Sequence, residues 1–385
     1  MIVIETVFSL APFITMTQET HFGISLSPKD FEERFLTLHK QLYSSKQFAF
    51  DDVTQHVYAP PAGMLQVDHS FIYDGQNWHL FYATGFMADN DAYIAAIKKR
   101  DFEAASRLSL EAGNGHAVGP DLFSLEFQEH LQFESLGRFD WIARGVGNVF
   151  HCDLDQPYGF LYDVKGDEGG KITGAMNLAW SSDLDHWQLS DRNPIHSPPA
   201  WTIPGSPFKD PHVMEFEGVY LIYYVSMDQR GYPSIGLTTT KDWETFSDEG
   251  AVFSLPSQLR GTMGIESPQV IHREGIWHLF FTYGEGLQHA ISPSPFSFVG
   301  ARDSFWNVGT GFYNIGPFHA TEIIQDGDHW WLSTDRKEET RRLNRFAGKL
   351  CYRGTQEDEQ TLLEGLYLSR IQWAGDQPTL VHPGR

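Results

Sequence analysis

Three acidic residues and one histidine open four similar stretches of this chain, and their types suit the hydrolysis of a sugar linkage. They are Asp68, Asp210, Glu266 and His319. Two carboxylates that face each other across a pocket can cleave a glycosidic bond: one donates a proton to the leaving oxygen, while the other activates water or attacks the sugar carbon. A third carboxylate can raise the pKa of the acid by like-charge repulsion.

The prediction of a functional site depends on the whole set. A single acid at the start of a strand usually caps a turn. Four such residues facing one channel are different, because their joint burial is unfavourable by several kcal/mol unless they bind a cation, share protons or meet a polar ligand. The fold must therefore bring together residues that lie far apart in the chain.

A repeated pattern supplies that fold. Each opening residue is followed by an apolar strand, a turn with glycine and a second, aromatic-rich strand. The first aromatic residue of the second strand follows the opening residue by 10 positions for Asp68 and Asp210, and by 11 positions for Glu266 and His319. A fifth, weaker copy spans residues 148–162. We interpret these five copies as units of one design, each with about four strands.

Repeated antiparallel units of this size predict an all-β fold, a five-bladed β-propeller. A blade cannot bury its faces alone and stacks on its neighbours around an axis. The first strand of each blade lines the central channel, so the residues that open these strands should meet at one mouth of it. The pattern thus predicts that all four residues converge on one pocket.

Two stretches lie outside the repeats. Residues 1–60 are predicted to form a helical lead-in packed on the propeller, with Ser27 as N-cap of a helix over residues 27–39. Residues 88–140 are predicted to interrupt the first blade as an insertion with a helix over residues 92–110. The propeller itself, with this insertion, is predicted to span residues 61–385.

The amino-acid composition argues against some classes of binding partner. The formal net charge is −22, and so acidic a surface repels phosphate backbones and anionic lipids, which argues against nucleic acid and membranes. Aromatic residues make up 14% of the chain, beside 35 glycines and 20 prolines, as expected for many short strands.

Cys152 and Cys351 allow at most one disulfide. The apolar start of the chain has no basic residue ahead of it and no transmembrane segment follows, so we expect a cytoplasmic protein.

Two blocks resemble a known group of enzymes, the five-bladed propeller glycoside hydrolases of family 43 and the related family 32. Lys-Asp-Pro at 209–211 is similar to their Arg-Asp-Pro block, with Lys209 in place of the usual arginine. Glu-Ser-Pro at 266–268 resembles their Glu-Gly-Pro or Glu-Cys-Pro block, and Asp68 occupies the first-blade position. The resemblance covers about residues 60–350.

The resemblance implies a role for each residue. Asp68 would be the base or nucleophile, Asp210 the acid that positions substrate and tunes the pKa of its neighbour, and Glu266 the general acid. His319 matches a fifth-blade histidine that approaches a central hydrated cation, commonly calcium, in many family 43 members. Because calcium prefers oxygen ligands, His319 would contact its water shell. The alternative is a pocket histidine without metal.

Family 43 is the better match. Family 32 enzymes usually carry Asn-Asp-Pro-Asn-Gly at the first acid, whereas this chain has Val-Asp-His-Ser at 67–70. Only a short stretch follows Cys351, where family 32 has a C-terminal β-sandwich. Family 43 mostly inverts, so the resemblance implies an inverting glycosidase in which Asp68 activates water. A family 32-like retaining β-fructosidase stays open.

Substrate contacts are predicted next to these residues. Aromatic rings can stack on sugar faces, and arginines can reach a substrate oxygen or a carboxylate, although most aromatics should instead pack between blades. The candidates are His69, Trp141, Arg144, Trp201, Trp306, Phe318 and Arg345. The sugar, its linkage and the oligomeric state stay open, with exo action on short oligosaccharides preferred.

Other functions remain possible on the same scaffold. A propeller can be a non-catalytic platform that binds carbohydrate or protein. The acid triad favours an enzyme, because a binding module has no need for a proton donor opposite a base. A phosphorylase or transglycosylase is a third candidate, but a phosphorylase needs basic residues near Asp68, and the sequence shows no clear cluster of them.

Overall fold

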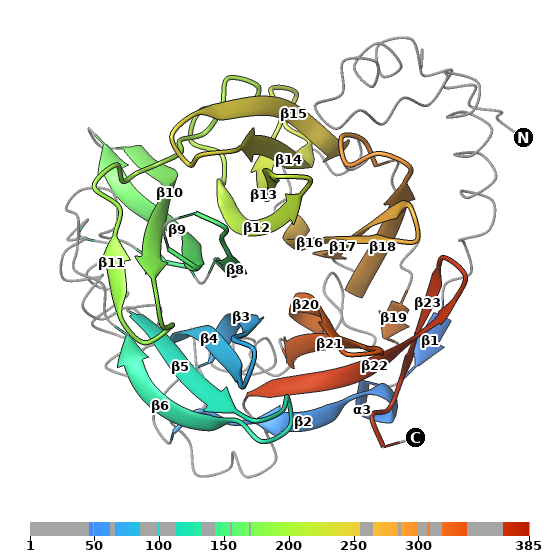
Figure 1. The fold of residues 1–385 in the computed structure, drawn as a ribbon. Coiled ribbons are helices and arrows are strands. Elements are labelled where there is room, and N and C mark those ends of the chain that lie inside the picture. The colour runs from blue at the N-terminus through green and yellow to red at the C-terminus, as the bar shows by residue number, and fades with distance from the viewer. Residues whose placement is uncertain are drawn as a thin grey trace, which may run out of the picture.

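The chain forms five small sheets around a central axis, so it is an all-β, five-bladed β-propeller as predicted (Figure 1). The computed structural model describes residues 46–48, 50–61, 66–84, 99, 113–131, 143–145, 147–154, 156–168, 171–254, 265–283, 286–298, 306–308, 318–336 and 365–384. Within these residues, no helix is long and apolar enough to cross a membrane.

The first three blades follow one another along the chain. Blade 1 contains β3 (Val67–Tyr73), β4 (Trp78–Thr84), β5 (Gly113–Gly119) and β6 (Glu126–Leu131). Blade 2 contains β7 (Ala143–Arg144), β8 (Asn148–His151), β9 (Tyr158–Glu168), β10 (Lys171–Ser181) and β11 (Trp187–Leu189). Blade 3 contains β12 (Lys209–Phe216), β13 (Val219–Met227), β14 (Pro233–Thr240) and β15 (Phe246–Ser254).

The last two blades also take strands from the N-terminal part of the chain. Blade 4 contains β16 (Ile265–Arg273), β17 (Ile276–Tyr283), β18 (Gly286–Ser292), β19 (Trp306–Val308) and β1 (Lys46–Phe48), which runs parallel to β19. Blade 5 contains β20 (Phe318–Asp326), β21 (His329–Arg336), β22 (Leu366–Ala374), β23 (Gln377–Val381) and β2 (Gln55–Tyr58). The described part of the predicted lead-in therefore supplies strands to these two sheets.

The helical parts of the prediction are not supported by the described residues. Between β1 and β2 there is one helix, α3 (Phe50–Val53), of four residues. The described part of the predicted insertion, residues 113–131, consists of β5 and β6 with the turn between them, because these strands complete the sheet of blade 1. The predicted helix at 27–39 lies outside the described residues, as does the one at 92–110 apart from Lys99.

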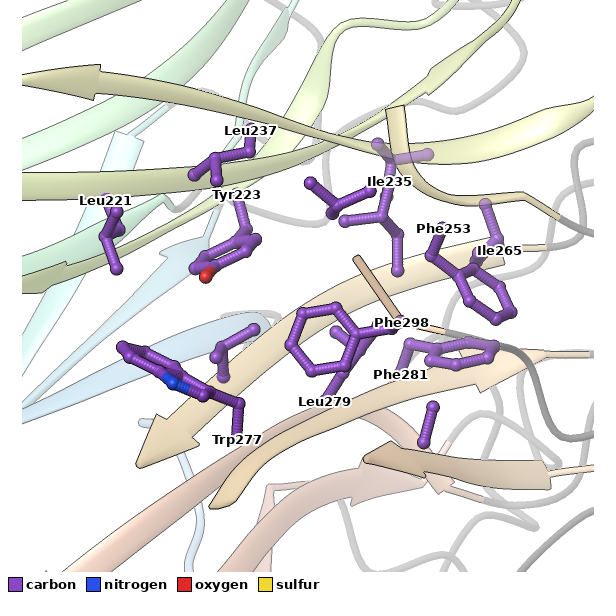
Figure 2. Close-up of a cluster of buried hydrophobic side chains, with 14 of the residues drawn as sticks. Leu221, Tyr223, Ile235, Leu237, Phe253, Ile265, Trp277, Leu279, Phe281 and Phe298 are labelled. Atoms are coloured by element: carbon purple, nitrogen blue, oxygen red, sulfur yellow. The ribbon is translucent and has the colours of Figure 1, made fainter. Parts of the chain in front are cut away.

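Packing between blades explains most of the aromatic residues. Figure 2 shows one such core, where Leu221 and Tyr223 from β13 pack with Trp277, Leu279 and Phe281 from β17. Trp277 and Phe281 are fully buried. Because apolar burial stabilises by about 25 cal/mol per Å², faces that interlock in this way hold each blade against the next. The inner strands are thereby fixed around the axis.

The inner strands of blades 1, 3, 4 and 5 all begin with a one-residue bulge. Pairing to the next strand shifts by one residue between Val67 and His69, Lys209 and His212, Glu266 and Gln269, and His319 and Glu322. The bulged residues adopt positive φ: Asp68 at 48°, Asp210 at 56°, Ser267 at 52° and Ala320 at 48°. A bulge bends the strand and re-aims its side chains, and here it does so at the same level in four blades.

Buried polar contacts link neighbouring inner strands. Glu322 of β20 accepts a hydrogen bond from the backbone N–H of Phe71 in β3 at 2.7 Å. Asn148 of β8 donates to the Ser70 hydroxyl at 3.1 Å and accepts from the Val213 N–H of β12 at 2.9 Å. Blades 5, 1, 2 and 3 are thus joined by side chains that satisfy backbone groups of the next blade.

Candidate functional site

Two of the three predicted acids, Asp68 and Asp210, line one pocket. Its walls include Asp68 and His69 from β3, Asp210 from β12, Ser267 from β16 and Ala320 from β20. In Figure 1 these strands surround the centre of the ring. Four of the five are bulge residues and His69 follows one, and the bulge turns the start of each inner strand toward the channel mouth. Residues separated by most of the chain are thereby neighbours.

Glu266 and His319 reach the same place from the position before their bulges. His319 Nε2 lies 3.8 Å from Asp68 Oδ1 and 3.8 Å from Glu266 Oε2. The four predicted residues are thus brought together, but they are not structurally equivalent, as the sequence pattern had suggested. Asp68 and Asp210 are bulge residues, whereas Glu266 and His319 precede the bulge.

Lys209 is the cation of this site. Its Nζ lies 3.1 Å from Asp210 Oδ2 and 3.2 Å from Glu266 Oε1. Burial alone would lower the pKa of Lys209, but the carboxylates of Asp210, Glu266 and Asp68 outweigh burial and raise it above its ordinary value. Lys209 therefore stays charged and offsets part of the negative charge in the pocket.

Asp335 orients two of the predicted residues, and sequence reasoning missed it. Its Oδ1 accepts a hydrogen bond from His319 Nδ1 at 2.6 Å, and its Oδ2 accepts from the Asp68 N–H at 3.1 Å. The Asp335 side chain is buried, at the end of β21 opposite His319. Only the hairpin register could have revealed it, because nothing in the sequence around Asp335 resembles the repeated pattern.

Asp210 is held from both sides. Its Oδ2 accepts the Ser267 N–H at 2.9 Å, in addition to the Lys209 contact. Its own N–H donates to Asp163 Oδ1 at 3.4 Å. Asp163, buried in β9, is a second residue that sequence reasoning missed. Blade 2 therefore contributes to the site through an acid on its second strand.

His69 lies in the pocket wall, as predicted, but it is neutral. Its Nε2 is 2.6 Å from the Ser333 hydroxyl, and its ring packs edge-on against Phe71. Burial lowers the pKa of His69 to about 4, with Asp335 and His319 acting in opposite directions. At neutral pH the ring can therefore position a ligand through hydrogen bonds but carries no charge.

Two of the predicted substrate contacts lie away from the pocket walls. Phe318 is fully buried in a core with Phe280 and Leu332, so it packs between strands and does not face the pocket. Trp201 stacks on Tyr224 and donates its indole N–H to Asp248 on β15, the outer strand of blade 3. Both aromatics serve blade packing, the alternative that applies to most rings in this chain.

The remaining candidates are described only in part. Arg144 lies in β7, paired with β9, and Trp306 lies in β19, paired with β18. Their side chains are not among those described, and Trp141 and Arg345 lie outside the described residues altogether.

Three groups near the pocket could approach a metal ion. Asp68, His319 and Asp335 each offer one ligand atom, and these atoms lie within 4.8 Å of one another. The set does not match a directly bound calcium ion, which takes six to eight oxygen ligands, because it includes an imidazole and both Asp335 oxygens already accept hydrogen bonds. A calcium ion bound through water stays a prediction.

Comparison with solved structures shows which known proteins share this fold. No family model matches the chain, and no curated protein matches its sequence. Among solved structures, a GH32 β-fructofuranosidase from Bombyx mori aligns with a TM-score of 0.57 at 14% identity, over 92% of this chain and 69% of that one. A thermostable family-43 glycoside hydrolase aligns with a TM-score of 0.55 at 12% identity, over 85% and 96%.

An inulosucrase from Halalkalicoccus jeotgali, solved with bound kestose, aligns with a TM-score of 0.60 at 13% identity, over 89% of this chain and 94% of that one. Identities this low establish the shared fold. The chain therefore has the five-bladed propeller fold found in GH32 and family 43 enzymes, and the predicted resemblance is confirmed at that level.

Proposed function

We propose that this protein is a glycoside hydrolase whose acids act from the mouth of the propeller channel. The observation that carries the proposal is the meeting of Asp68 and Glu266, from blades 1 and 4, at equal distances of 3.8 Å from His319 Nε2. Two carboxylates that approach each other from different blades beside one small polar pocket are the equipment for cleaving a glycosidic bond. Sugar-handling enzymes among the structures with this fold support the same interpretation.

Each residue then has a defined role. Glu266 donates a proton to the leaving oxygen from Oε2, because Oε1 accepts from Lys209. Asp68 acts on the other side as base or nucleophile. Asp210, fixed by Lys209 and the Ser267 N–H, holds a substrate hydroxyl. Asp335 and His319 keep Asp68 in place. Preorganised groups of this kind are effective because they need no rearrangement during the reaction.

The stereochemical outcome depends on the separation of the two carboxylates. Twice the 3.8 Å distance from His319 sets its upper limit. That limit admits the spacing of retaining enzymes, about 5–5.5 Å, and the shorter inverting spacings, from about 6.5 Å. We propose inversion, with a water activated by Asp68, and a retaining fructosidase is the alternative. Proton NMR of the first-formed anomer distinguishes them.

The decisive experiment is a screen of the purified protein against aryl glycosides of fructose-type, arabinofuranose, xylose and galactose-type sugars. Glu266→Gln removes the transferable proton with little change in volume, so it should lower kcat at least about 10²-fold. Glu217→Gln, an exposed change in the hairpin between β12 and β13, is the matched control and should be silent. Full activity in Glu266→Gln would refute the assignment of the general acid.

One observation favours a second candidate, a carbohydrate-binding propeller without turnover. Lys209 stands where the related enzymes have arginine, and its ammonium contacts both Asp210 and Glu266. A lysine that holds Glu266 ionised would leave the pocket able to bind a polyol but not to protonate a leaving group. Silence of the wild type on every substrate, together with a rise in Tm on adding the same sugars, would support this candidate.

A further inference from the structure

A second cluster of metal-ligating side chains lies at the outer junction of blades 1 and 2, away from the pocket. It contains His79 on β4, His116 on β5 and Asp185 in the turn between β10 and β11, beside blade 1 in Figure 1. One ligand atom from each residue lies within 4.8 Å of the others. Both histidines are buried, whereas the Asp185 side chain is 54% exposed, so the cluster opens to solvent on one side.

Hydrogen bonding fixes the tautomers of the two histidines. Asp74 Oδ1 accepts hydrogen bonds from the backbone N–H groups of Gln76 and Asn77, both at 2.6 Å, as expected of a carboxylate that only accepts. His79 Nε2, 3.2 Å from Asp74 Oδ2, must then donate. In a neutral His79 ring Nδ1 is then the nitrogen without a proton, so it accepts from His116 Nε2 at 2.9 Å. In consequence His116 Nδ1 carries a lone pair and no proton.

That lone pair faces a carboxylate. His116 Nδ1 is fully buried, has no hydrogen-bond partner among the described residues, and lies 3.7 Å from Asp185 Oδ1. A lone pair and a carboxylate in this position repel each other unless a cation lies between them.

The spacing suits one ion. Bonds from zinc to nitrogen and to carboxylate oxygen are roughly 2.0–2.2 Å, so a single ion slightly off the line between the two atoms reaches both across 3.7 Å. We propose that a divalent transition-metal ion of the zinc class binds between His116 Nδ1 and the Asp185 carboxylate and cross-links blades 1 and 2. The imidazole selects such an ion over calcium, and water completes its coordination on the exposed side.

The Asp74–His79 pair is the outer support of this site. Metal-bound histidines typically donate their second N–H to a carboxylate or another acceptor, which fixes the tautomer and raises the basicity of the ligand. Here His116 donates to His79, and His79 donates to Asp74. The same relay that leaves His116 Nδ1 unprotonated thus prepares it to bind a metal.

Blade 4 contains the same histidine pair, but with an arginine in place of Asp74. His278 Nδ1 lies 3.0 Å from His289 Nε2, and His289 stacks on Phe280 at 4.5 Å, much as His116 stacks on Phe81 at 4.4 Å. The stacked pair is therefore a packing feature that two blades share.

The surroundings of the two histidine pairs differ at one position at the end of the inner strand. Counted from the bulge, Arg273 occupies in blade 4 the place of Asp74 in blade 1. Burial and the positive charge of Arg273 lower the pKa of His278, so this pair lacks the acceptor that orients its counterpart. Asp74, which orients the histidine pair, therefore distinguishes blade 1 from blade 4.

The test is equilibrium dialysis of the EDTA-treated full chain against Zn²⁺, with bound zinc measured by mass spectrometry. Asp185→Asn should weaken one zinc site at least about tenfold, because the amide carries no charge. His186→Gln, which removes an adjacent and exposed histidine, is the matched control and should leave that site unchanged. Equal zinc binding by the wild type and Asp185→Asn would overturn the proposal, as would loss of binding in His186→Gln.

A second variant tests the relay. Asp74→Asn keeps an oxygen for the N–H groups of Gln76 and Asn77 but turns an NH₂ toward His79 Nε2. His79 must then donate through Nδ1 to His116 Nε2, which places a proton on His116 Nδ1. We expect zinc affinity to fall by about 10–100-fold. Nitrogen NMR should show the changed tautomer, and an unchanged tautomer with unchanged affinity would refute the relay. Neither result bears on the proposed hydrolase.

Discussion

At the scale of single residues, the charged side chains of the pocket offset one another, and individual atoms of these side chains make different contacts. Lys209 contacts two acids, and Asp335 uses one oxygen for His319 and the other for the Asp68 N–H. A carboxylate can accept two hydrogen bonds in this way, whereas an amide offers one acceptor oxygen and one donor nitrogen. Asp335 is therefore a positioning residue whose charge and shape both matter.

Asp335→Asn should expose this requirement. If the amide oxygen accepts the hydrogen bond from His319 Nδ1, the amide NH₂ group faces the Asp68 N–H, and two donors then meet. If the amide is flipped, its NH₂ group faces His319 Nδ1, so the proton of His319 must move to Nε2. Either change misplaces a group beside Asp68. We expect kcat on the substrate found in the screen to fall about 10²-fold, with KM little changed.

Two readouts separate positioning from a loss of folding. Nitrogen NMR of His319 reports its tautomer directly, and urea unfolding reports stability. Asp328→Asn, an exposed change in the same β20–β21 hairpin, is the matched control. An unaltered His319 tautomer together with wild-type kcat would show that Asp335 has no positioning role.

At the scale of elements, the bulge at the start of the inner strands explains what the sequence could and could not predict. The alternation of apolar strands and aromatic-rich second strands is visible in the sequence, and it correctly predicted five blades and a meeting of the acids. The offsets of 10 and 11 residues already differed. They differ because Asp68 and Asp210 are bulge residues, whereas Glu266 and His319 precede the bulge.

Other residues of the site lie beyond the reach of that pattern. Asp163 and Asp335 sit on second strands, where their place depends on how each strand pairs with the bulged strand beside it. Aromatic type alone also cannot separate a ring that stacks on sugar from one that packs between blades, as Trp201 and Phe318 do. Pairing register and packing, both long-range properties, decide these positions.

The buried contact of Glu322 in β20 with β3 should make the stability of the fold depend on pH. Burial raises the pKa of Glu322 to about 8, although hydrogen bonds from Phe71 and Ser70 lower it. The native protein thus keeps a proton that the unfolded chain releases near pH 4.5, its ordinary value. The free energy of unfolding should therefore fall between pH 4.5 and 8, by up to about 1.4 kcal/mol per pH unit, and level off above.

Glu322→Gln should remove this dependence. Its free energy of unfolding, measured with urea, should exceed that of the wild type increasingly from pH 4.5 to 8, because the variant has no charge to bury. The difference between the two proteins isolates Glu322 from the histidines that titrate in the same range. Glu126→Gln, on the exposed strand β6, should run parallel to the wild type. A constant offset for Glu322→Gln across this range would contradict the raised pKa.

At the scale of the whole molecule, the ring is closed by strands from both parts of the chain. β2 pairs with β22, so that blade 5 combines residues 55–58 with residues 366–368. The Ser369 hydroxyl donates to the Val53 carbonyl at 2.7 Å across the same join. In a closed ring both faces of each blade are covered, so each blade stabilises two neighbours. The pocket depends on this closure, because blades 1 and 5 supply Asp68 and His319.

Tyr58 links the closing strand to blade 1. It belongs to β2 in the sheet of blade 5, yet its hydroxyl lies 2.8 Å from that of Tyr82 on β4, and both rings are buried. Burial raises the pKa of Tyr58 to about 12, so neither hydroxyl ionises under ordinary conditions. Tyr58→Phe leaves the Tyr82 hydroxyl without this partner in an apolar core.

We expect Tyr58→Phe to lower the free energy of unfolding by about 1–3 kcal/mol, the usual effect of an unsatisfied buried hydroxyl. If the ring unfolds as one unit, tryptophan fluorescence and circular dichroism should report one shared urea midpoint, shifted to lower urea with an unchanged slope. Tyr73→Phe, the same change at a ring 40% exposed in blade 1, should have little effect. Separate midpoints for the two signals would instead mean that blades 5 and 1 open before the rest, and that the join between them is the weakest interface of the ring.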